Sequence, residues 1–232
     1  MLISIHIPKT AGRSWQAQLE SEFGSRLLYD EEFENKVDSL EAYKEIFEKN
    51  TPRADMRDKA QKAKLREQRD ALMRDYDVIH GHFVADKYLG VFPVTDFMAI
   101  FRDPYQQMVS AYHFMKRKEG DLFRKYNPTI PQFIEAFSNM QAPFLGSLAL
   151  EELVMVGITE QYDRSVALFE AIFGKKISRE LKRVNTNPDR QGDAYVIDAN
   201  VKAAVDRYCS ADIELYQRAQ VKFQQLASHY GV

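Results

Sequence analysis

The feature that most constrains the fold is a strand–turn–helix pattern that occurs twice in the chain. FMAIF, residues 97–101, is a continuous apolar run, which is typical of a strand buried on both faces of a parallel sheet. A polar turn follows, and residues 105–117 then carry apolar side chains at helical spacing. MLISIHI, residues 1–7, alternates isoleucine with polar residues as a short strand does, and a helix is expected from about residue 14. The pattern predicts an α/β domain with a central, mainly parallel sheet flanked by helices.

Other segments extend this alternation over the 232 residues, which we expect to form a single domain. A short strand is predicted at 77–79, with Gly81 at its exit into a loop, and another at 153–159. An amphipathic helix closed by Gly174 follows the second of these strands, and a C-terminal helix in two pieces covers 199–229. A charged, helical insertion is expected at about 30–75. Its basic part, 53–75, favours a solvated surface helix, and a basic wall for an anionic acceptor is the alternative.

Net charge, cysteine count and hydropathy limit which partners and which cellular compartment are expected. The net charge of −2 gives no global reason to expect a nucleic-acid partner. Cys209 is the only cysteine, so an intrachain disulfide is impossible, and we expect a small buried residue in a reducing compartment. No basic leader with an apolar region and no span of about 20 apolar residues is present, so we expect no signal peptide, no membrane anchor and a cytoplasmic location.

The turn HIPKTAGRSW, residues 6–15, lies between the first predicted strand and helix. Thr10 or Ser14 is a candidate helix cap. A helix start offers unpaired N–H groups to an anion, and the Lys9 ammonium with the hydroxyls of Thr10 and Ser14 would add hydrogen-bond donors. The turn is therefore predicted to bind a phosphate. The Walker A pattern is absent, which weakens an NTP-hydrolysing interpretation. The alternative is an ordinary turn with a solvated lysine.

Arg102 opens the turn after the buried strand, and Ser110 follows eight residues later on the next helix. A guanidinium suits a phosphate, so these two residues could bind a second phosphate, separate from the one at Lys9. The alternative is that Arg102 pairs with Asp103 or another carboxylate and that Ser110 is a surface hydroxyl.

His80 and His82 are expected on the loop after the strand at 77–79. They could bind a metal, for which no third ligand is evident; they could be structural; or one could be a general base. Ligands of parallel α/β sheets bind beyond the carboxyl ends of the strands. The Lys9 turn, the two histidines and Arg102 all follow strands, so we expect them to converge.

HIPKTAGRSW and FRDPYQQMVSAYHFMKR together resemble the two cofactor signatures of sulfotransferases that use 3′-phosphoadenosine-5′-phosphosulfate (PAPS). HGHF resembles the histidine segment of the carbohydrate type, which includes the heparan-sulfate and uronyl 2-O-sulfotransferases. VGITEQYDRSVALFE and SADIELYQRAQVKF are similar to later helical segments of the same family. The resemblance implies a P-loop-like three-layer domain that transfers a sulfuryl group from PAPS to a hydroxyl, most readily of a carbohydrate.

The resemblance also implies roles for individual residues. The turn would bind the 5′-phosphosulfate, with Lys9 near the bridging oxygen; its members are Lys9, Thr10, Ala11, Gly12, Arg13 and Ser14. Arg102 and Ser110 would bind the 3′-phosphate. His82 would be the catalytic base and His80 its accompanying histidine.

Two departures from the family leave alternatives open. Its animal members carry a membrane anchor and many have disulfides, so this chain is expected to be a bacterial, cytoplasmic relative. Some relatives use a glutamate base, which Glu31, Glu32 or Glu34 could supply. Trp15 could line the nucleotide site or belong to the core. The competing functions are a nucleotide or sugar kinase and a non-catalytic nucleotide-binding module.

Overall fold

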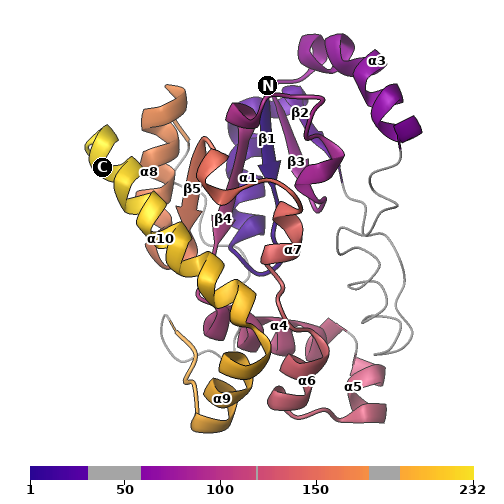
Figure 1. The fold of residues 1–232 in the computed structure, drawn as a ribbon, viewed down its shortest axis with the longest axis vertical. Coiled ribbons are helices and arrows are strands. Elements are labelled where there is room, and N and C mark those ends of the chain that lie inside the picture. Colours follow the sequence, from indigo (N-terminus) through magenta and orange to yellow (C-terminus); the bar gives the residue numbers. More distant parts are fainter. Residues whose placement is uncertain (31–58, 119, 178–193) are drawn as a thin grey trace.

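A five-stranded, all-parallel sheet forms the centre of the computed structural model, which describes residues 1–30, 59–118, 120–177 and 194–232 (Figure 1). The strand order is β2-β3-β1-β4-β5. The strands are β1 Leu2–Ile5, β2 Leu27–Tyr29, β3 Val78–Gly81, β4 Phe97–Phe101 and β5 Met155–Ile158. Every residue of β1, β3, β4 and β5 is buried, as the apolar runs require for strands covered on both faces. The predicted α/β class is therefore confirmed.

Helices cover both faces of the sheet. Helix α1, Gly12–Phe23, lies behind the sheet in Figure 1, and its Trp15 ring meets Phe169 of α8, Tyr162–Phe173, edge to face at 4.9 Å. Helix α10, Ser210–Tyr230, and the short α7, Ala142–Leu145, cross the near face. Trp15 is 2% exposed and its place is the core.

A second hydrophobic core lies beyond the carboxyl ends of the strands, at the bottom of Figure 1. It is built by α4 Pro104–Lys118, α5 Gly120–Tyr126, α6 Ile130–Ala136 and α9 Ala199–Tyr208. Its buried side chains include Met108, Tyr112, Phe123, Phe133, Phe137, Val205 and Cys209. The predicted burial of Cys209 is confirmed, and burial raises the pKa of its thiol to about 11, so the thiol stays protonated.

Helix α3, Lys59–Asp75, lies at the opposite end of the sheet, where the strands begin (Figure 1). Its basic side chains donate to the turn that precedes β4: Lys62 Nζ to Leu89 O at 3.1 Å and Arg69 Nε to Val91 O at 3.1 Å. From residue 59 on, the basic part of the predicted insertion is a helix, and this helix docks on backbone carbonyls away from the carboxyl ends of the strands. Residues 31–58, which include the three candidate glutamate bases, lie outside the described residues.

Strands β1 and β5 are shorter than predicted, and two further boundaries near the predicted site residues also differ. Strand β3 extends to Gly81, so His80 lies inside the strand and not on the loop after it. Helix α1 begins at Gly12, two residues earlier than expected. The C-terminal helix is divided as predicted, into α9 and α10, and α8 ends at Gly174 with φ of 64°.

Candidate active site

The turn between β1 and α1 holds an unusual backbone. Lys9 and Ala11 both have φ of 65°, in the left-handed region where side chains other than glycine are disfavoured. Such positions persist only where the surroundings hold them, and they cluster at functional sites. Three side chains hold this turn through its carbonyls: Thr10 Oγ1 donates to Ile7 O at 2.9 Å, Gln107 Nε2 to Pro8 O at 2.8 Å and Arg102 to Lys9 O at 2.9 Å. The turn is therefore fixed before any ligand arrives.

The start of α1 has no side-chain cap, which corrects the prediction of a cap from Thr10 or Ser14. Ala11 is the cap residue, and its side chain offers no acceptor. The Thr10 hydroxyl bonds to Ile7, and Ser14 is the third residue of the helix. Ser14 N already donates to Ala11 O at 3.0 Å, so the groups that this uncapped start presents to an anion are the N–H groups of its first two residues, Gly12 and Arg13, at the positive end of the dipole.

Lys9 lies among other cations. Burial, followed by the charges of Arg102, Arg117 and Arg13, lowers the pKa of its ammonium from 10.5 to about 8. The Lys9 Nζ is 4.1 Å from the centre of the Phe114 ring. A bound anion would offset the mutual repulsion of these cations, so the group is suited to binding a phosphate or sulfate.

Arg102 is directly connected to the Lys9 turn. Its guanidinium donates to Lys9 O, and its Nε is 3.8 Å from Glu160 Oε1, so the carboxylate partner that was the alternative to a phosphate is present and is Glu160. Its backbone is held on both sides by Gln141: Arg102 N donates to Gln141 Oε1 at 3.0 Å, and Gln141 Nε2 donates to Arg102 O at 2.8 Å. Asp103 instead accepts from the Gln106 N–H at 3.0 Å, at the start of α4.

Helix α4 turns one face toward the Lys9 side chain. Ser110, Phe114 and Arg117 are spaced three and four residues apart, so they share a face, and Phe114 contacts Lys9. Ser110 is 7% exposed. Phe114 and Arg117 were not among the predicted site residues; their spacing from Ser110 is the signal that could have found them.

Three imidazoles form a stack across the ends of β1 and β3. The His6 ring lies 3.8 Å from that of His82 and 5.0 Å from that of His80, centre to centre. Ser4 pairs with His80 in the parallel register of the two strands, so His6 comes beside His82 two residues later. His6 was not singled out from the sequence, although its alternation with Ser4 marks it as the next side chain on that face.

His80 and His82 are in different environments. His80 is 1% exposed, its Nδ1 is 2.9 Å from Ser4 Oγ, and burial lowers its pKa to about 3, so it is a neutral, interior group. His82 is half-buried just beyond β3, and its Nδ1 is 2.6 Å from the carbonyl oxygen of His6. A carbonyl only accepts, so Nδ1 of His82 carries the proton and Nε2 carries the lone pair. Nε2 of His82 is thus the nitrogen able to take a proton.

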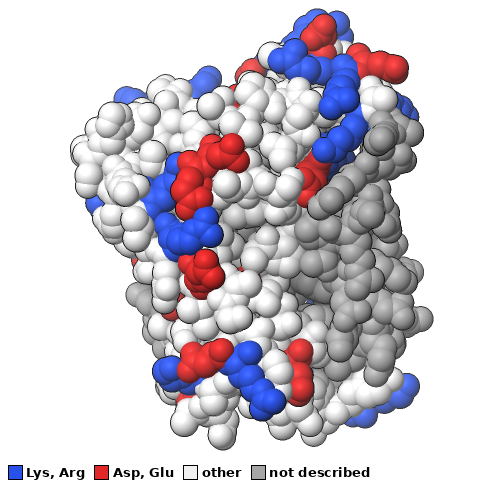
Figure 2. All heavy atoms as spheres, in the orientation of Figure 1, with Lys and Arg blue, Asp and Glu red and all other residues white. Residues whose placement is uncertain are grey.

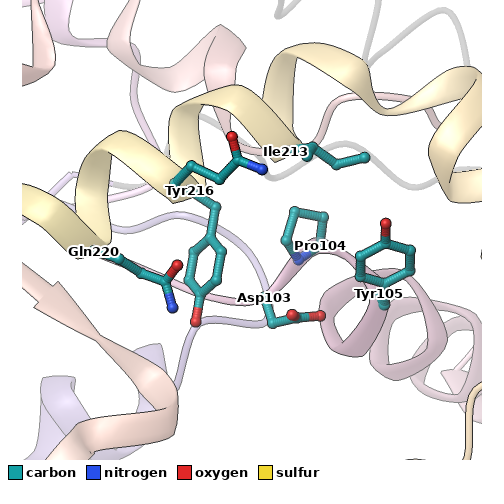
Figure 3. A pocket seen from close by; sticks show the side chains of 7 residues that line it. Asp103, Pro104, Tyr105, Ile213, Tyr216 and Gln220 are labelled. Carbon is teal, nitrogen blue, oxygen red and sulfur yellow. The ribbon is translucent and has the colours of Figure 1, made fainter.

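A hollow of about 220 Å³ lies beside the turn between β4 and α4 (Figure 3). Asp103 lines it from the turn, Pro104 and Tyr105 from the start of α4, and Ile213, Tyr216, Gln217 and Gln220 from α10. The Tyr216 hydroxyl donates to Glu160 at 2.9 Å, and burial raises the pKa of Glu160. None of the predicted site residues lines this hollow.

Charge on the surface is mixed on the face in Figure 2, where Lys and Arg gather most densely over α3. Within the described ranges, no three His, Cys, Asp or Glu side chains are grouped to hold a metal ion. No helix of the described part is both long and apolar enough to cross a membrane.

The predicted residues thus occupy one edge of the sheet. The Lys9–Ser14 turn, Arg102 and His82 follow β1, β4 and β3, which are adjacent in the sheet, and Arg102 and Lys9 are in contact. His80 lies beneath them in the strand. Comparison with models of known protein families and with curated proteins found no match to this sequence.

Proposed function

We propose that the chain is a PAPS-dependent sulfotransferase that transfers a sulfuryl group to a hydroxyl, most naturally of a carbohydrate. The observation that carries the proposal is the placement of a cation cluster, formed by half-buried Lys9, buried Arg102 and exposed Arg13 and Arg117, next to a histidine with a defined basic nitrogen. The cluster follows β1 and β4, and His82 follows β3, the strand on the other side of β1. The two cofactor signatures that resemble this enzyme class supply the cations, and the HGHF segment supplies His82.

The donor set fits a molecule with two separated anionic groups. The uncapped start of α1 and Lys9 would bind the 5′-phosphosulfate, and Arg102 with Ser110 would bind the 3′-phosphate. Arg102 keeps a fixed backbone because Gln141 bonds both its N–H and its carbonyl. The lowered pKa of Lys9 supports an anion here, since binding one relieves the repulsion that lowers it.

The chemistry is an in-line transfer that depends on positioning and on charge neutralisation. Nε2 of His82 takes the proton of the acceptor hydroxyl as its oxygen bonds to sulfur. The bond between sulfur and the 5′-phosphate oxygen breaks at the same time, and PAP leaves. Lys9 and the N–H groups at the start of α1 stabilise the charge that grows on the departing phosphate.

The test is thermal unfolding with PAP, set against 5′-ADP and ATP–Mg²⁺. PAP at about 100 times its dissociation constant should add about 2.7 kcal/mol, a rise of about 5–10 °C for a chain of this size. Lys9→Ala should abolish the shift, and Lys175→Ala, which changes a half-exposed lysine beside Glu22, should keep it.

Each of the other outcomes contradicts the proposal. A shift with ATP–Mg²⁺ in place of PAP favours a kinase, and no shift with any nucleotide means that the Lys9 turn is not a nucleotide site. PAP binding without transfer to any of a broad panel of sugars favours a non-catalytic module. The cytoplasmic, bacterial setting belongs to the same proposal and is supported by the resemblance and the lone buried cysteine.

A further inference from the structure

The histidine stack contains one imidazole to which the sequence motifs assign no role. His6 comes directly after β1 and is 9% exposed. Burial, then the charges of His82, His80, Lys9 and Arg13, lower its pKa well below 6.5, so it is neutral at physiological pH. It lies between the Lys9 turn and the proposed base.

His6 acts on His82 through both its backbone and its ring. Its carbonyl accepts the Nδ1–H of His82 at 2.6 Å, which selects the tautomer with the lone pair on Nε2. Its ring stacks on that of His82 at 3.8 Å, with 19° between the planes. Together these contacts restrain both the tautomer and the orientation of the His82 ring.

The other edge of the His6 ring meets the start of α1. A Cβ added to Gly12 would lie 1.5 Å from His6 Nε2, so the ring occupies the space that a side chain at position 12 would need. Nδ1 of His6 is buried and has no hydrogen-bond partner among the described residues. The ring is therefore placed by its packing against Gly12 and His82 and not by a hydrogen bond from Nδ1.

We propose that His6 is a positioning residue that links the anion-binding turn to the base. Its ring and its backbone carbonyl hold the His82 ring with Nε2 toward the acceptor. The same ring packs against the start of α1, so the position of His82 is fixed relative to the anion-binding turn. The inference rests on the proposed function, because it takes His82 as the group that accepts the proton. His6 itself need not touch the acceptor.

The test is the tautomer of His82, read from the ¹⁵N resonances of its imidazole in the full chain at a pH well above the ordinary imidazole pKa. In the wild type, Nδ1 should give the signal of a protonated nitrogen and Nε2 that of an unprotonated one. His6→Ala keeps the carbonyl but removes the ring that stacks on His82, so the His82 ring can turn away from the carbonyl and both nitrogens should move toward averaged values. His6→Gln, whose planar amide can reach the same space, should restore much of the difference.

His113→Ala is the matched control, because it removes a half-buried imidazole that stacks on Tyr195, outside the three-histidine stack. It should leave the His82 resonances unchanged. Wild-type His82 resonances in His6→Ala would overturn the proposal, as would a wild-type His82 with its proton on Nε2. Should His6→Ala not fold, His6→Leu decides in its place: it fills much of the same volume but has no planar ring to stack on His82, so it should shift the same resonances.

Turnover provides the second readout once an acceptor is identified. Misplacing a catalytic group by about 1 Å can cost about 10²-fold, so His6→Ala should lower kcat by about 10–100-fold while the KM for PAPS stays within about threefold. The spectroscopic result does not need PAPS. A changed tautomer without PAP binding would reject the proposed function alone, and PAP binding with an unchanged tautomer would reject the role of His6 alone.

Discussion

At the scale of single residues, the charge of Lys9 should make the affinity for PAP depend on pH. Its pKa is about 8 without ligand, because burial and positive neighbours disfavour the ammonium. An anion favours the ammonium, so it binds the protonated form better and raises that pKa. The affinity for PAP should therefore fall as pH rises from 7 through 8 toward 10, by at most about tenfold per unit.

Titration calorimetry over that pH range measures the effect, and Lys9→Arg is the control, since a guanidinium keeps its charge throughout. The Arg variant should show a much flatter profile even if its affinity is lower. An equally steep fall in Lys9→Arg would assign the pH dependence to another group.

At the scale of elements, Gln141 joins β4 to α7 and α10, and so positions Arg102. Gln141 N donates to Asp212 Oδ2 at 3.0 Å, and Ala142 N donates to Asp212 Oδ1 at 2.8 Å, while the Gln141 amide holds the Arg102 backbone. Gln141→Ala would leave a buried N–H and a buried carbonyl of Arg102 unpaired, at about 1–3 kcal/mol each. We expect the free energy of unfolding in urea to fall by about 2–6 kcal/mol, and PAP affinity to fall at least about tenfold.

Gln16→Ala serves as the comparison, because that amide makes an exposed 3.3 Å bond to Glu20 within α1. It should change stability by less than about 0.5 kcal/mol and leave PAP binding intact. If Gln141→Ala lost stability but bound PAP as tightly as wild type, Gln141 would be structural only.

Individual elements also show which parts of the fold could be predicted from the sequence. FMAIF predicted a buried strand correctly, because an apolar run flanked by polar turns has few other solutions in a chain of this kind. The stacking of His6 on His82 could not be predicted from the sequence, because it depends on the register between β1 and β3, whose paired residues are 76 positions apart in the chain. The start of α1 was misplaced for a local reason: Ala11 adopts a left-handed conformation that its side chain does not favour, and no capping side chain marks the boundary.

At the scale of the whole molecule, the proposed site joins two separate cores. The Lys9 turn leads from the sheet, whereas Ser110 and Phe114 lie on α4, which packs into the helical core beyond the strand ends. A ligand bound by both Lys9 and Ser110 would connect them. PAP should therefore slow amide hydrogen exchange in peptides covering 6–15 and 102–118 together, since local opening of either segment would now release the ligand.

Helix α3 provides the internal control for that exchange measurement, because it lies at the other end of the sheet and docks on the turn at 89–91 (Figure 1). Exchange in 62–75 should be the same with and without PAP. Protection confined to 6–15 would mean that only the Lys9 turn binds PAP, through a single phosphate. Ser110 would then not belong to the binding site. Protection spread evenly through α3 would indicate global stabilisation alone. Protection of both segments with α3 unchanged is what a ligand held between the sheet edge and α4 requires, since only that position restrains both cores locally.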